Sequence, residues 1–477
     1  MGIPNFLSHI INCAGREVDL QDYSSRKEPL RVAIDASSWI HRACFTYSDV
    51  LADEKHLNNY GRSILQCEEQ QKETPGLDIA VSSNNDVLEF IAKSCQTVME
   101  YVLSFQKATK TEILIVLDGT TPPIKAATVT DRGVKRGIEQ VYRDLPVDKA
   151  AQSPLLERRF KANRRTGAGE HYKSVVEAVI IALRSEEIPF LVAPYEADAQ
   201  LAFLQINGYV DLVVTEDSDL IAYGLFTPLL YRWSRNSQGF MSRGVLLRRD
   251  DLSAMFDFNV QKNLIDLTDF IPSMLACLFA CLGCDYCIKL RGIGLSLACR
   301  EIRAAFFTKD ASECSPLERL MNSLFKSTWD RSKLSDDDKD AFERDFLAAV
   351  FMYRHAMIYD PIEARCKPMI AFCDADKELT SFGPYAAILR NELRASSIIG
   401  RPFPPIIASH IAEGWICPKS LKMRNTAMPA ANIQNDLDIY IADSSTHFRD
   451  NESLTQPEIF SPNSKSVSQC ILERQES

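Results

Sequence analysis

The sequence has few histidines, no long apolar run and no disulfide-like cysteine spacing, and each absence excludes a class of protein or site. Seven histidines in 477 residues leave little material for a histidine-built zinc site. The longest nearly apolar run, residues 274–284, is too short to cross a bilayer. The first 20 residues lack the apolar core of a secretory signal, so we expect a soluble intracellular protein. The fourteen cysteines show no disulfide-like spacing, as expected in a reducing compartment.

A surplus of positive charge is also absent. The formal net charge is −10, whereas proteins that bind nucleic acid usually present a basic surface. The total is only a sum, however, and a metal site built from carboxylates would itself add negative charge. Whether the chain can bind nucleic acid therefore depends on how the charge is distributed along it.

One cysteine run needs its own interpretation. Cys281, Cys284 and Cys287 form a C-x2-C-x2-C pattern, but Arg291 stands where a bacterial iron–sulfur motif has its fourth cysteine. Since no second cysteine pair lies nearby for zinc, we expect buried thiols rather than a metal site.

Four aliphatic runs predict buried parallel strands, at residues 31–35, 112–118, 188–193 and 211–217. Between them, apolar residues recur at helical spacing. Leu88 and Val102 lie on the predicted face of one helix, and Val175 and Leu183 on that of another. Strands that alternate with helices predict an α/β fold with a mostly parallel central sheet flanked by helices.

Acidic residues gather where these strands end. In an open parallel sheet the carboxyl ends of the strands form the edge where ligands bind. Seven acids are placed to reach that edge: Asp35, Asp118, Glu196, Asp198, Asp217, Asp219 and Asp285.

A single aspartate at a strand end is more often a helix cap or a solvated loop residue than a ligand. Seven such acids repel one another, and bound divalent cations would compensate their negative charge. Oxygen ligands with few histidines suit Mg²⁺ or Mn²⁺ better than zinc. Two ions about 4 Å apart would stabilise an in-line displacement at a phosphate. The acids therefore predict a two-metal phosphodiesterase.

The segments around the acids are specific, at residues 32–36, 117–119, 193–200, 215–220 and 283–295. They resemble the 5′ nuclease family that comprises flap endonucleases, exonuclease 1 and the xeroderma-group-G nucleases, over residues 1 to about 432. The resemblance implies a PIN-like 5′ nuclease core with a helix-two-turn-helix region for DNA binding. It also implies that all seven acids hold two Mg²⁺ ions, for which Mn²⁺ can substitute, and that Asp35 and Asp118 are catalytic.

Three features favour the exonuclease-1 branch of the family. His41 stands where flap endonucleases tend to have a tyrosine that stacks on duplex DNA, and Asp198 stands where they carry a glutamate. The third feature is the segment 426–429, which resembles a segment that closes the exonuclease-1 core. In addition, the sequence lacks the sliding-clamp box that flap endonucleases usually carry. The alternatives are a flap endonuclease, a junction resolvase or a catalytically inactive DNA-binding scaffold.

The missing positive charge is concentrated in residues 125–173, which hold twelve basic and six acidic residues. This segment supplies the electrostatic footprint for DNA. The resemblance implies that Lys125 and Arg132 grip the scissile phosphate as catalytic residues. Residues 126–137 are poor helix formers, so we expect this gateway to become ordered on DNA.

The resemblance assigns DNA contacts beyond Lys125 and Arg132 to Gly2, His41, Arg42, Arg291, Gly292 and Gly294. Glycines at a tight turn allow backbone amides to approach a phosphate. The resemblance further implies a K⁺ ion at the helix-two-turn-helix.

We predict five regions along the chain. They are an N-terminal nuclease region (1–118, with an insertion at 49–85), a gateway (119–170), an internal nuclease region (171–272), a core-closing helical region (273–432) and a disordered tail (433–477). The resemblance implies a structure-specific 5′ to 3′ double-stranded DNA exonuclease with 5′-flap endonuclease activity. It implies a nuclear, monomeric protein of DNA repair and recombination that acts on 5′ ends, nicks or flaps. Mismatch-repair proteins are candidate partners, and no membrane is involved.

Overall fold

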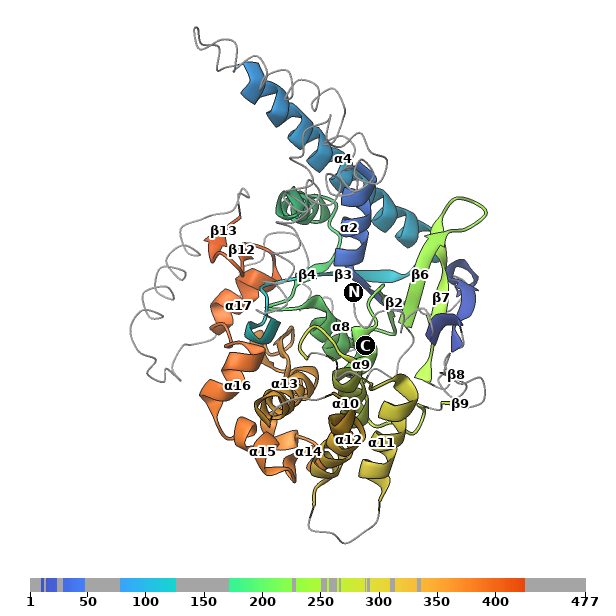
Figure 1. Cartoon of the computed structure of the whole chain (residues 1–477). Helices are drawn as coiled ribbons and strands as arrows, with labels where there is room; N and C mark the ends of the chain where they lie inside the picture. The colour runs from blue at the N-terminus through green and yellow to red at the C-terminus, as the bar shows by residue number, and fades with distance from the viewer. Residues whose placement is uncertain are drawn as a thin grey trace, which may run out of the picture. The chain divides into compact units, whose positions relative to one another are not determined.

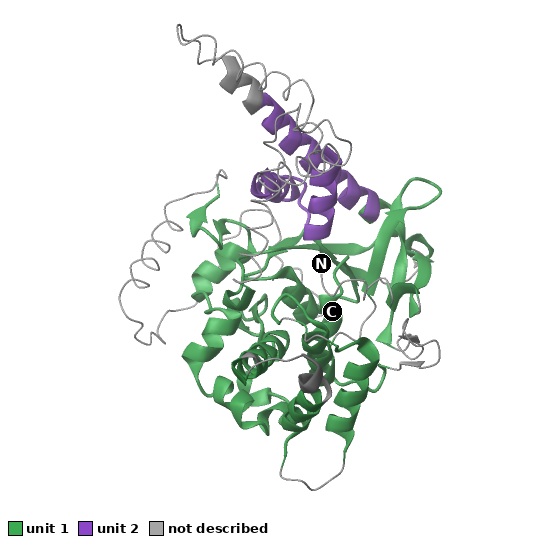
Figure 2. Ribbon diagram, viewed as in Figure 1, with its two compact units in different colours: residues 1–35, 106–126, 189–477 green, residues 36–105, 127–188 purple. Residues whose placement is uncertain are grey.

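The chain forms two compact units, which are coloured separately in Figure 2. Unit 1 comprises residues 1–35, 106–126 and 189–477, and unit 2 comprises residues 36–105 and 127–188. The computed structural model describes residues 10–12, 14–23, 29–47, 78–125, 171–224, 229–249, 255–256, 264–265, 267–287, 289, 292–308, 314–332 and 336–424.

Unit 1 is built on a seven-stranded sheet (Figure 1). The strands are β1 (Arg16–Asp19), β2 (Arg31–Asp35), β3 (Glu112–Leu117), β4 (Phe190–Val192), β5 (Leu212–Val214), β6 (Leu229–Arg235) and β7 (Met241–Leu247). Their order is β1-β7-β6-β5-β2-β3-β4. Strands β4, β3, β2, β5 and β6 run parallel, and β7 and β1 add antiparallel pairings.

The four aliphatic runs of the sequence coincide with β2, β3, β4 and β5, so the predicted mostly parallel sheet is confirmed. Ile34, Ile115 and Val214 are at most 1% exposed, as expected for strands covered on both faces. The antiparallel edge formed by β6, β7 and β1 was not part of the prediction.

Helices complete unit 1. They are α8 (Ala197–Ile206), α9 (Asp219–Ala222), α10 (Pro272–Leu282), α11 (Leu295–Phe307), α12 (Pro316–Ser332), α13 (Asp336–His355), α14 (Lys377–Thr380), α15 (Gly383–Leu389), α16 (Glu392–Ile399) and α17 (Pro405–Ala412). Helix α8 packs on β2, β3 and β5, and α10 packs against α9, α11 and α13. The flanking helices of the predicted fold are thus present.

Short elements fill the remainder of unit 1. The 3-10 helices are η1 (Leu20–Tyr23), η2 (Pro123–Lys125) and η4 (Phe372–Asp374). Three two-stranded pairs are β8 (Met255–Phe256) with β9 (Leu264–Ile265), β10 (Met357–Asp360) with β11 (Arg365–Pro368), and β12 (Ile416–Cys417) with β13 (Lys422–Met423). No helix in the described ranges is both long and apolar enough to cross a membrane.

Unit 2 is helical where it is described, with α2 (Ala36–Tyr47), α4 (Asp78–Thr109) as far as residue 105, and a helix over residues 171–185. Trp39 of α2 is buried and meets the rings of Tyr101 and Phe105 edge-on, at centroid distances of 6.2 and 6.0 Å. These contacts join α2 to α4.

Helix α4 corrects one detail of the sequence analysis. Leu88 is 63% exposed, whereas Phe90 and Phe105 are at most 1% exposed. Val98 and Val102 are at most 2% exposed, so the predicted face is confirmed in this part of the helix; Leu88 is the exception, and Phe90 and Phe105 complete the buried face. Helix α4 already begins at Asp78, inside the segment 49–85 that the sequence suggests is an insertion.

Candidate active site

The seven acids all belong to unit 1, and the sheet explains how they meet. Asp35 is the last residue of β2, and Asp118 directly follows β3. Because β2 and β3 are parallel neighbours, both side chains lie at the same edge of the sheet. Strand β5 pairs with the other side of β2 and leads to Asp217 and Asp219 at that edge.

Glu196 and Asp198 reach the same edge from α8. Glu196 is the N-cap of the helix and Asp198 lies in its first turn. The amide of Ala197 donates a hydrogen bond to Oδ1 of Asp118 at 2.9 Å, which joins the helix start to the end of β3. Gly119 permits this approach, because a Cβ there would lie 1.9 Å from the carbonyl oxygen of Ala193.

Thr215 organises the acids that follow β5. Its hydroxyl donates to Oδ2 of Asp35 at 3.2 Å and accepts from the amide of Asp217 at 3.0 Å. The amide of Asp219 then donates to Oδ1 of Asp217 at 3.1 Å. The sequence analysis did not assign Thr215 a role, although it stands inside one of the matching segments.

Asp285 joins the group through a lysine. The ammonium of Lys125, at the end of η2, lies 2.9 Å from Oδ2 of Asp285 and also forms a hydrogen-bonded ion pair with Oε1 of Glu196. All three side chains are at least four-fifths buried. We call the seven acids together with Lys125 the acidic site.

Charge in the acidic site is unbalanced, and the pKa values reflect this. Burial raises the pKa of Asp198 well above its ordinary value, and the charges of Asp217 and Asp35 raise it further. Burial also raises the pKa of Asp219, with Asp217 adding to the effect.

Lys125 reduces this imbalance at one end of the site. Burial raises the pKa of Glu196, and the charge of Lys125 opposes that rise. Burial disfavours the ammonium of Lys125 itself, but Glu196 and Asp285 outweigh it and raise the lysine's pKa. Among the described residues, Lys125 pairs with two of the seven acids, so further positive charge would stabilise the site.

The donor set fits divalent cations of the Mg²⁺ type, since only carboxyl oxygens converge and none of the seven is a softer ligand. Oδ1 of Asp219 is buried and has no hydrogen-bond partner in the described part of the chain, as expected for an oxygen reserved for a ligand. Among the described residues, however, no group of three or more His, Cys, Asp and Glu side chains is already placed to hold a metal ion. Lys125 supplies the positive charge at the Glu196–Asp285 end of the site.

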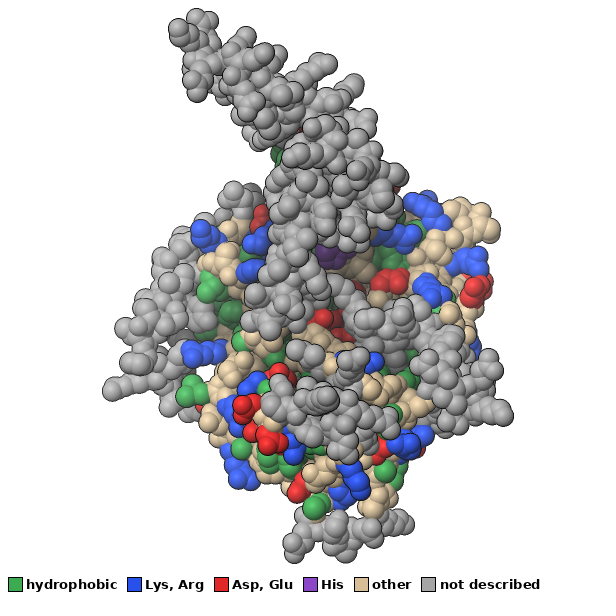
Figure 3. All heavy atoms as spheres, viewed as in Figure 1, with side chains coloured by type: hydrophobic (Ala, Val, Ile, Leu, Met, Phe, Trp, Pro, Cys, Tyr) green, Lys and Arg blue, Asp and Glu red, His purple; other side chains and the backbone are tan. Residues whose placement is uncertain are grey.

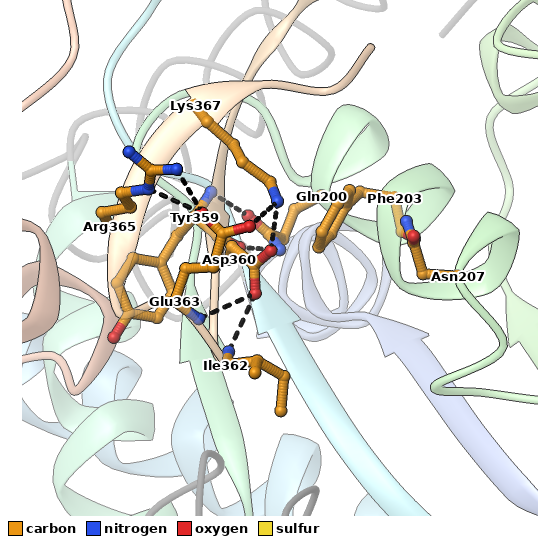
Figure 4. A network of polar contacts seen from close by, with 9 residues as sticks. All are labelled: Gln200, Phe203, Asn207, Tyr359, Asp360, Ile362, Glu363, Arg365 and Lys367. Carbon is orange, nitrogen blue, oxygen red and sulfur yellow. Dashed lines mark hydrogen bonds and ion pairs between the residues drawn. The ribbon is translucent and has the colours of Figure 1, made fainter. Parts of the chain in front are cut away.

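A second polar network holds α8 from its other side (Figure 4). The side-chain amide of Gln200 donates to the carbonyl of Tyr359 and accepts from its amide, both at 2.8 Å. Gln200 thereby pairs with β10 as a neighbouring strand would. Lys367 on β11 lies 5.5 Å from the ring centroid of Phe203, one turn further along α8. The two hydrogen bonds of Gln200 anchor the helix that carries Glu196 and Asp198.

The residues expected to touch DNA are only partly described. Gly2, Arg132 and Arg291 lie outside the described residues, as do residues 126–170, which contain most of the basic gateway. In unit 2, His41 and Arg42 are exposed on α2, and the His41 ring stacks on Tyr172 with a centroid distance of 4.3 Å. On the face drawn in Figure 3, the Lys and Arg side chains of the described residues are interspersed with acids.

Gly292 and Gly294 precede α11 in unit 1. Both are exposed, while Ile293 between them is 1% exposed and anchors the turn. Gly292 has φ +95°, which favours glycine, and a Cβ on either glycine would meet nothing within 4 Å. The two glycines therefore present bare backbone at the start of a helix, where amides attract anions.

The cysteine run is free thiol. Cys281 and Cys287 are buried and Cys284 is half-buried, all without disulfides. Burial raises the pKa of Cys284 to about 12, so its thiol is neutral. This agrees with the expectation of packed thiols.

Sequence comparisons place these residues in a known group. The family pattern XPG I-region matches residues 187–285, which contain five of the seven acids. Exonuclease 1 of Xenopus laevis is 24% identical over 374 residues, covering 77% of this chain and 41% of that protein. Exonuclease 1 of Arabidopsis thaliana is 30% identical over 246 residues, covering 51% and 27%. Exodeoxyribonuclease 1 of Schizosaccharomyces pombe is 23% identical over 421 residues, covering 87% and 57%. The chain therefore spans about a quarter to three-fifths of the length of these relatives.

Solved structures include similar chains at low identity. The catalytic core of Rad2 in complex with DNA substrate aligns with a TM-score of 0.41 and 16% identity, covering 86% of this chain and 98% of that one. The Holliday junction-resolving enzyme GEN1 with product DNA and Mg²⁺ aligns with a TM-score of 0.39 and 15% identity, covering 87% and 74%.

Proposed function

Because the chain belongs to the family of exonuclease 1 and the related XPG-type 5′ nucleases, we propose that it is a structure-specific 5′ nuclease of DNA repair. Its expected activities are 5′ to 3′ exonuclease action on double-stranded DNA and cleavage at 5′ flaps. The observation that carries the proposal is the convergence of seven acids and one lysine at the carboxyl ends of β2, β3 and β5. Because the acids would repel a polyanionic substrate, the site can bind one only when cations are also bound.

The acids are the proposed ligands of two Mg²⁺ ions, with Mn²⁺ as a substitute. Bound ions would supply Lewis-acid activation of the phosphate and of the attacking water. The chain's own contribution is to orient the carboxylates. Thr215 positions Asp35 and Asp217, the amide of Ala197 positions Asp118, and the burial of Asp219 excludes bulk water. No side-chain nucleophile is required.

Lys125 is the proposed electrostatic partner of the scissile phosphate, together with Arg132. Its ammonium is held at the acids by Glu196 and Asp285, which keep it charged. A phosphate at this site would meet a cation already in place, and pre-positioned charge needs little reorganisation during reaction.

Duplex DNA is the proposed ligand of the segment around Gly292 and Gly294, with a K⁺ ion and Arg291 beside it. Backbone contacts of this kind read no base sequence. His41, Arg42 and Gly2 are the proposed contacts near the 5′ end. We further infer action in the nucleus as a monomer, with mismatch-repair proteins as candidate partners.

The experiment that tests the function compares two labelled substrates, a duplex with a recessed 5′ end and a duplex with a 5′ flap, in Mg²⁺ and in chelator. Stepwise short products from the recessed end support the exonuclease. Dominant single cuts at the flap base would instead favour a flap endonuclease, and the absence of any Mg²⁺-dependent product on both substrates would refute the nuclease. Asp340→Asn, which changes an exposed acid on α13, is the matched control for acid substitutions and should cleave normally.

A further inference from the structure

Three tyrosines lie beside the acidic site and belong neither to its acids nor to the predicted DNA contacts. Tyr223 follows α9, Tyr286 follows Asp285, and Tyr353 lies on α13. We call them the tyrosine cluster. All three are buried, at 1%, 8% and 0% exposure. The ring of Tyr353 meets those of Tyr223 and Tyr286 edge-on, each at a centroid distance of 5.2 Å.

Two of the hydroxyls contact acids of the site. Tyr286 donates a hydrogen bond to Oε2 of Glu196, and Tyr353 donates to Oδ2 of Asp219 at 3.3 Å. Each tyrosine therefore holds one oxygen of a carboxylate and leaves the other oxygen for a second partner. That partner is Lys125 for Glu196, whereas Oδ1 of Asp219 has none within the described ranges.

The third hydroxyl supports the first. The hydroxyls of Tyr223 and Tyr286 are 3.5 Å apart. Since Tyr286 gives its only proton to Glu196, its oxygen is the acceptor in this contact and Tyr223 is the donor. A chain of donors that ends on a carboxylate polarises each member in the same direction.

Packing alone does not explain these hydroxyls. Phenylalanine rings would fill the same space, and a buried hydroxyl is unfavourable unless it forms a hydrogen bond. A tyrosine hydroxyl donates one hydrogen bond, and a donor aimed at one carboxylate oxygen fixes the orientation of that carboxylate.

We propose that Tyr286 and Tyr353 are positioning residues that orient Glu196 and Asp219 and thereby set the affinity of the acidic site for divalent cations. The proposal rests on the proposed nuclease function, because it assumes that these acids hold the ions. Hydrogen-bond partners behind metal ligands typically change metal affinity by about 10- to 100-fold when removed. The Tyr286 contact, reinforced by Tyr223, should have the larger effect.

The test measures Mn²⁺ binding to the full chain by calorimetry, without DNA, for the unmodified protein, Tyr286→Phe and Tyr353→Phe. We expect a dissociation constant about 10-fold higher for Tyr286→Phe and a smaller rise for Tyr353→Phe. Tyr385→Phe is the matched control, because Tyr385 is fully buried and its hydroxyl has no hydrogen-bond partner among the described residues. It should bind Mn²⁺ as the unmodified chain does.

A second measurement separates positioning from damage to the fold. Cleavage by Tyr286→Phe should need more Mg²⁺ but approach the unmodified rate when Mg²⁺ is saturating, with a melting temperature close to that of Tyr385→Phe. Unchanged Mn²⁺ affinity in both cluster variants, or equal weakening in Tyr385→Phe, overturns the positioning role while leaving the nuclease intact. If the unmodified chain binds no Mn²⁺ that Asp219→Asn abolishes, the proposed function fails as well.

Discussion

Unit 1 contains two clusters in which one lysine lies between two acids, and they differ in what surrounds them. In the acidic site, Lys125 joins Glu196 and Asp285 next to five further acids. In the hairpin cluster, formed by Asp360, Glu363 and Lys367 on β10, β11 and their turn, Lys367 lies 2.5 Å from Asp360 and 2.6 Å from Glu363 (Figure 4).

The hairpin cluster is balanced. Oδ1 of Asp360 accepts from the amides of Ile362 and Glu363, at 2.8 and 3.2 Å, and Arg365 adds a second cation at Glu363. Within the described ranges the acidic site has no such balance, since Lys125 pairs with only two of its seven acids. The same kind of ion pair therefore has two different effects. Where neighbouring donors and cations compensate the carboxylates, it stabilises a turn. Where negative charge remains uncompensated, the site favours binding of further cations.

The largest expected difference lies in catalysis. Asp217→Ala should lower cleavage by more than about 1000-fold while DNA binding persists, because a proposed metal ligand is lost. Asp360→Ala removes a more deeply buried acid, 3% exposed, from the hairpin cluster and should leave the rate of the folded enzyme unchanged. The check is single-turnover cleavage beside a DNA-binding isotherm, and cleavage retained by Asp217→Ala would contradict the metal site.

The two lysines should differ next. Lys125→Ala should slow cleavage by about 100-fold at saturating Mg²⁺, since a charge placed for the phosphate is lost. Lys367→Ala should cleave normally and lose about 1 kcal/mol of unfolding free energy, because it removes a partly exposed ion pair. Rates and urea unfolding of both variants test this, and equal rates would show that the two lysines have the same role.

Without divalent cations, the acids of the acidic site should lower the free energy of unfolding of the folded chain. Asp219→Asn should raise the free energy of unfolding by about 1–3 kcal/mol at pH 7, because it removes a buried charge with too few partners. The pKa of Asp219 is raised in the folded state, so the folded chain binds the extra proton and its stability falls as the pH rises from about 4 toward neutrality. The gain from Asp219→Asn should therefore shrink at pH 5, as measured by urea unfolding at both pH values.

The smallest effect is expected at Glu363. Hydrogen bonding by Lys367 lowers the pKa of Glu363 in the folded state, so its contribution is present above about pH 4.5 and lost as the pH falls. Glu363→Gln should cost at most about 0.5 kcal/mol at pH 7, because the group is 38% exposed and screened by solvent. A stabilising effect in the same unfolding assay would contradict the view that this cluster is balanced.

Local sequence patterns were sufficient to predict much of the fold and the positions of the seven acids. The runs at 31–35 and 112–118 predicted parallel strands because continuous aliphatic residues suit a sheet covered on both faces. The topology of such a sheet then brings Asp35 and Asp118 to one edge, which is why strand-end acids could be assembled without a structure. Their role as metal ligands remains a prediction.

Other features had no local signal. Leu88 of α4 is exposed although Val102 of the same predicted face is buried, and the neighbouring Phe90 is buried instead, which periodicity alone did not show. Tyr353 lies 134 residues from Asp219, and nothing in the α13 sequence marks its hydroxyl as a donor to that acid.

By itself, therefore, the sequence determined the parallel core, the type and order of the acids and the resemblance to the XPG-type 5′ nucleases, because these depend on residue identity and short-range periodicity. Only the tertiary structure decided that Lys125 pairs with Glu196 and Asp285, that Gln200 binds the backbone of Tyr359, and that tyrosines support the carboxylates from behind. Hydrogen bonds and charge interactions act over a few ångströms. Which distant residues come within that range depends on how the helices pack.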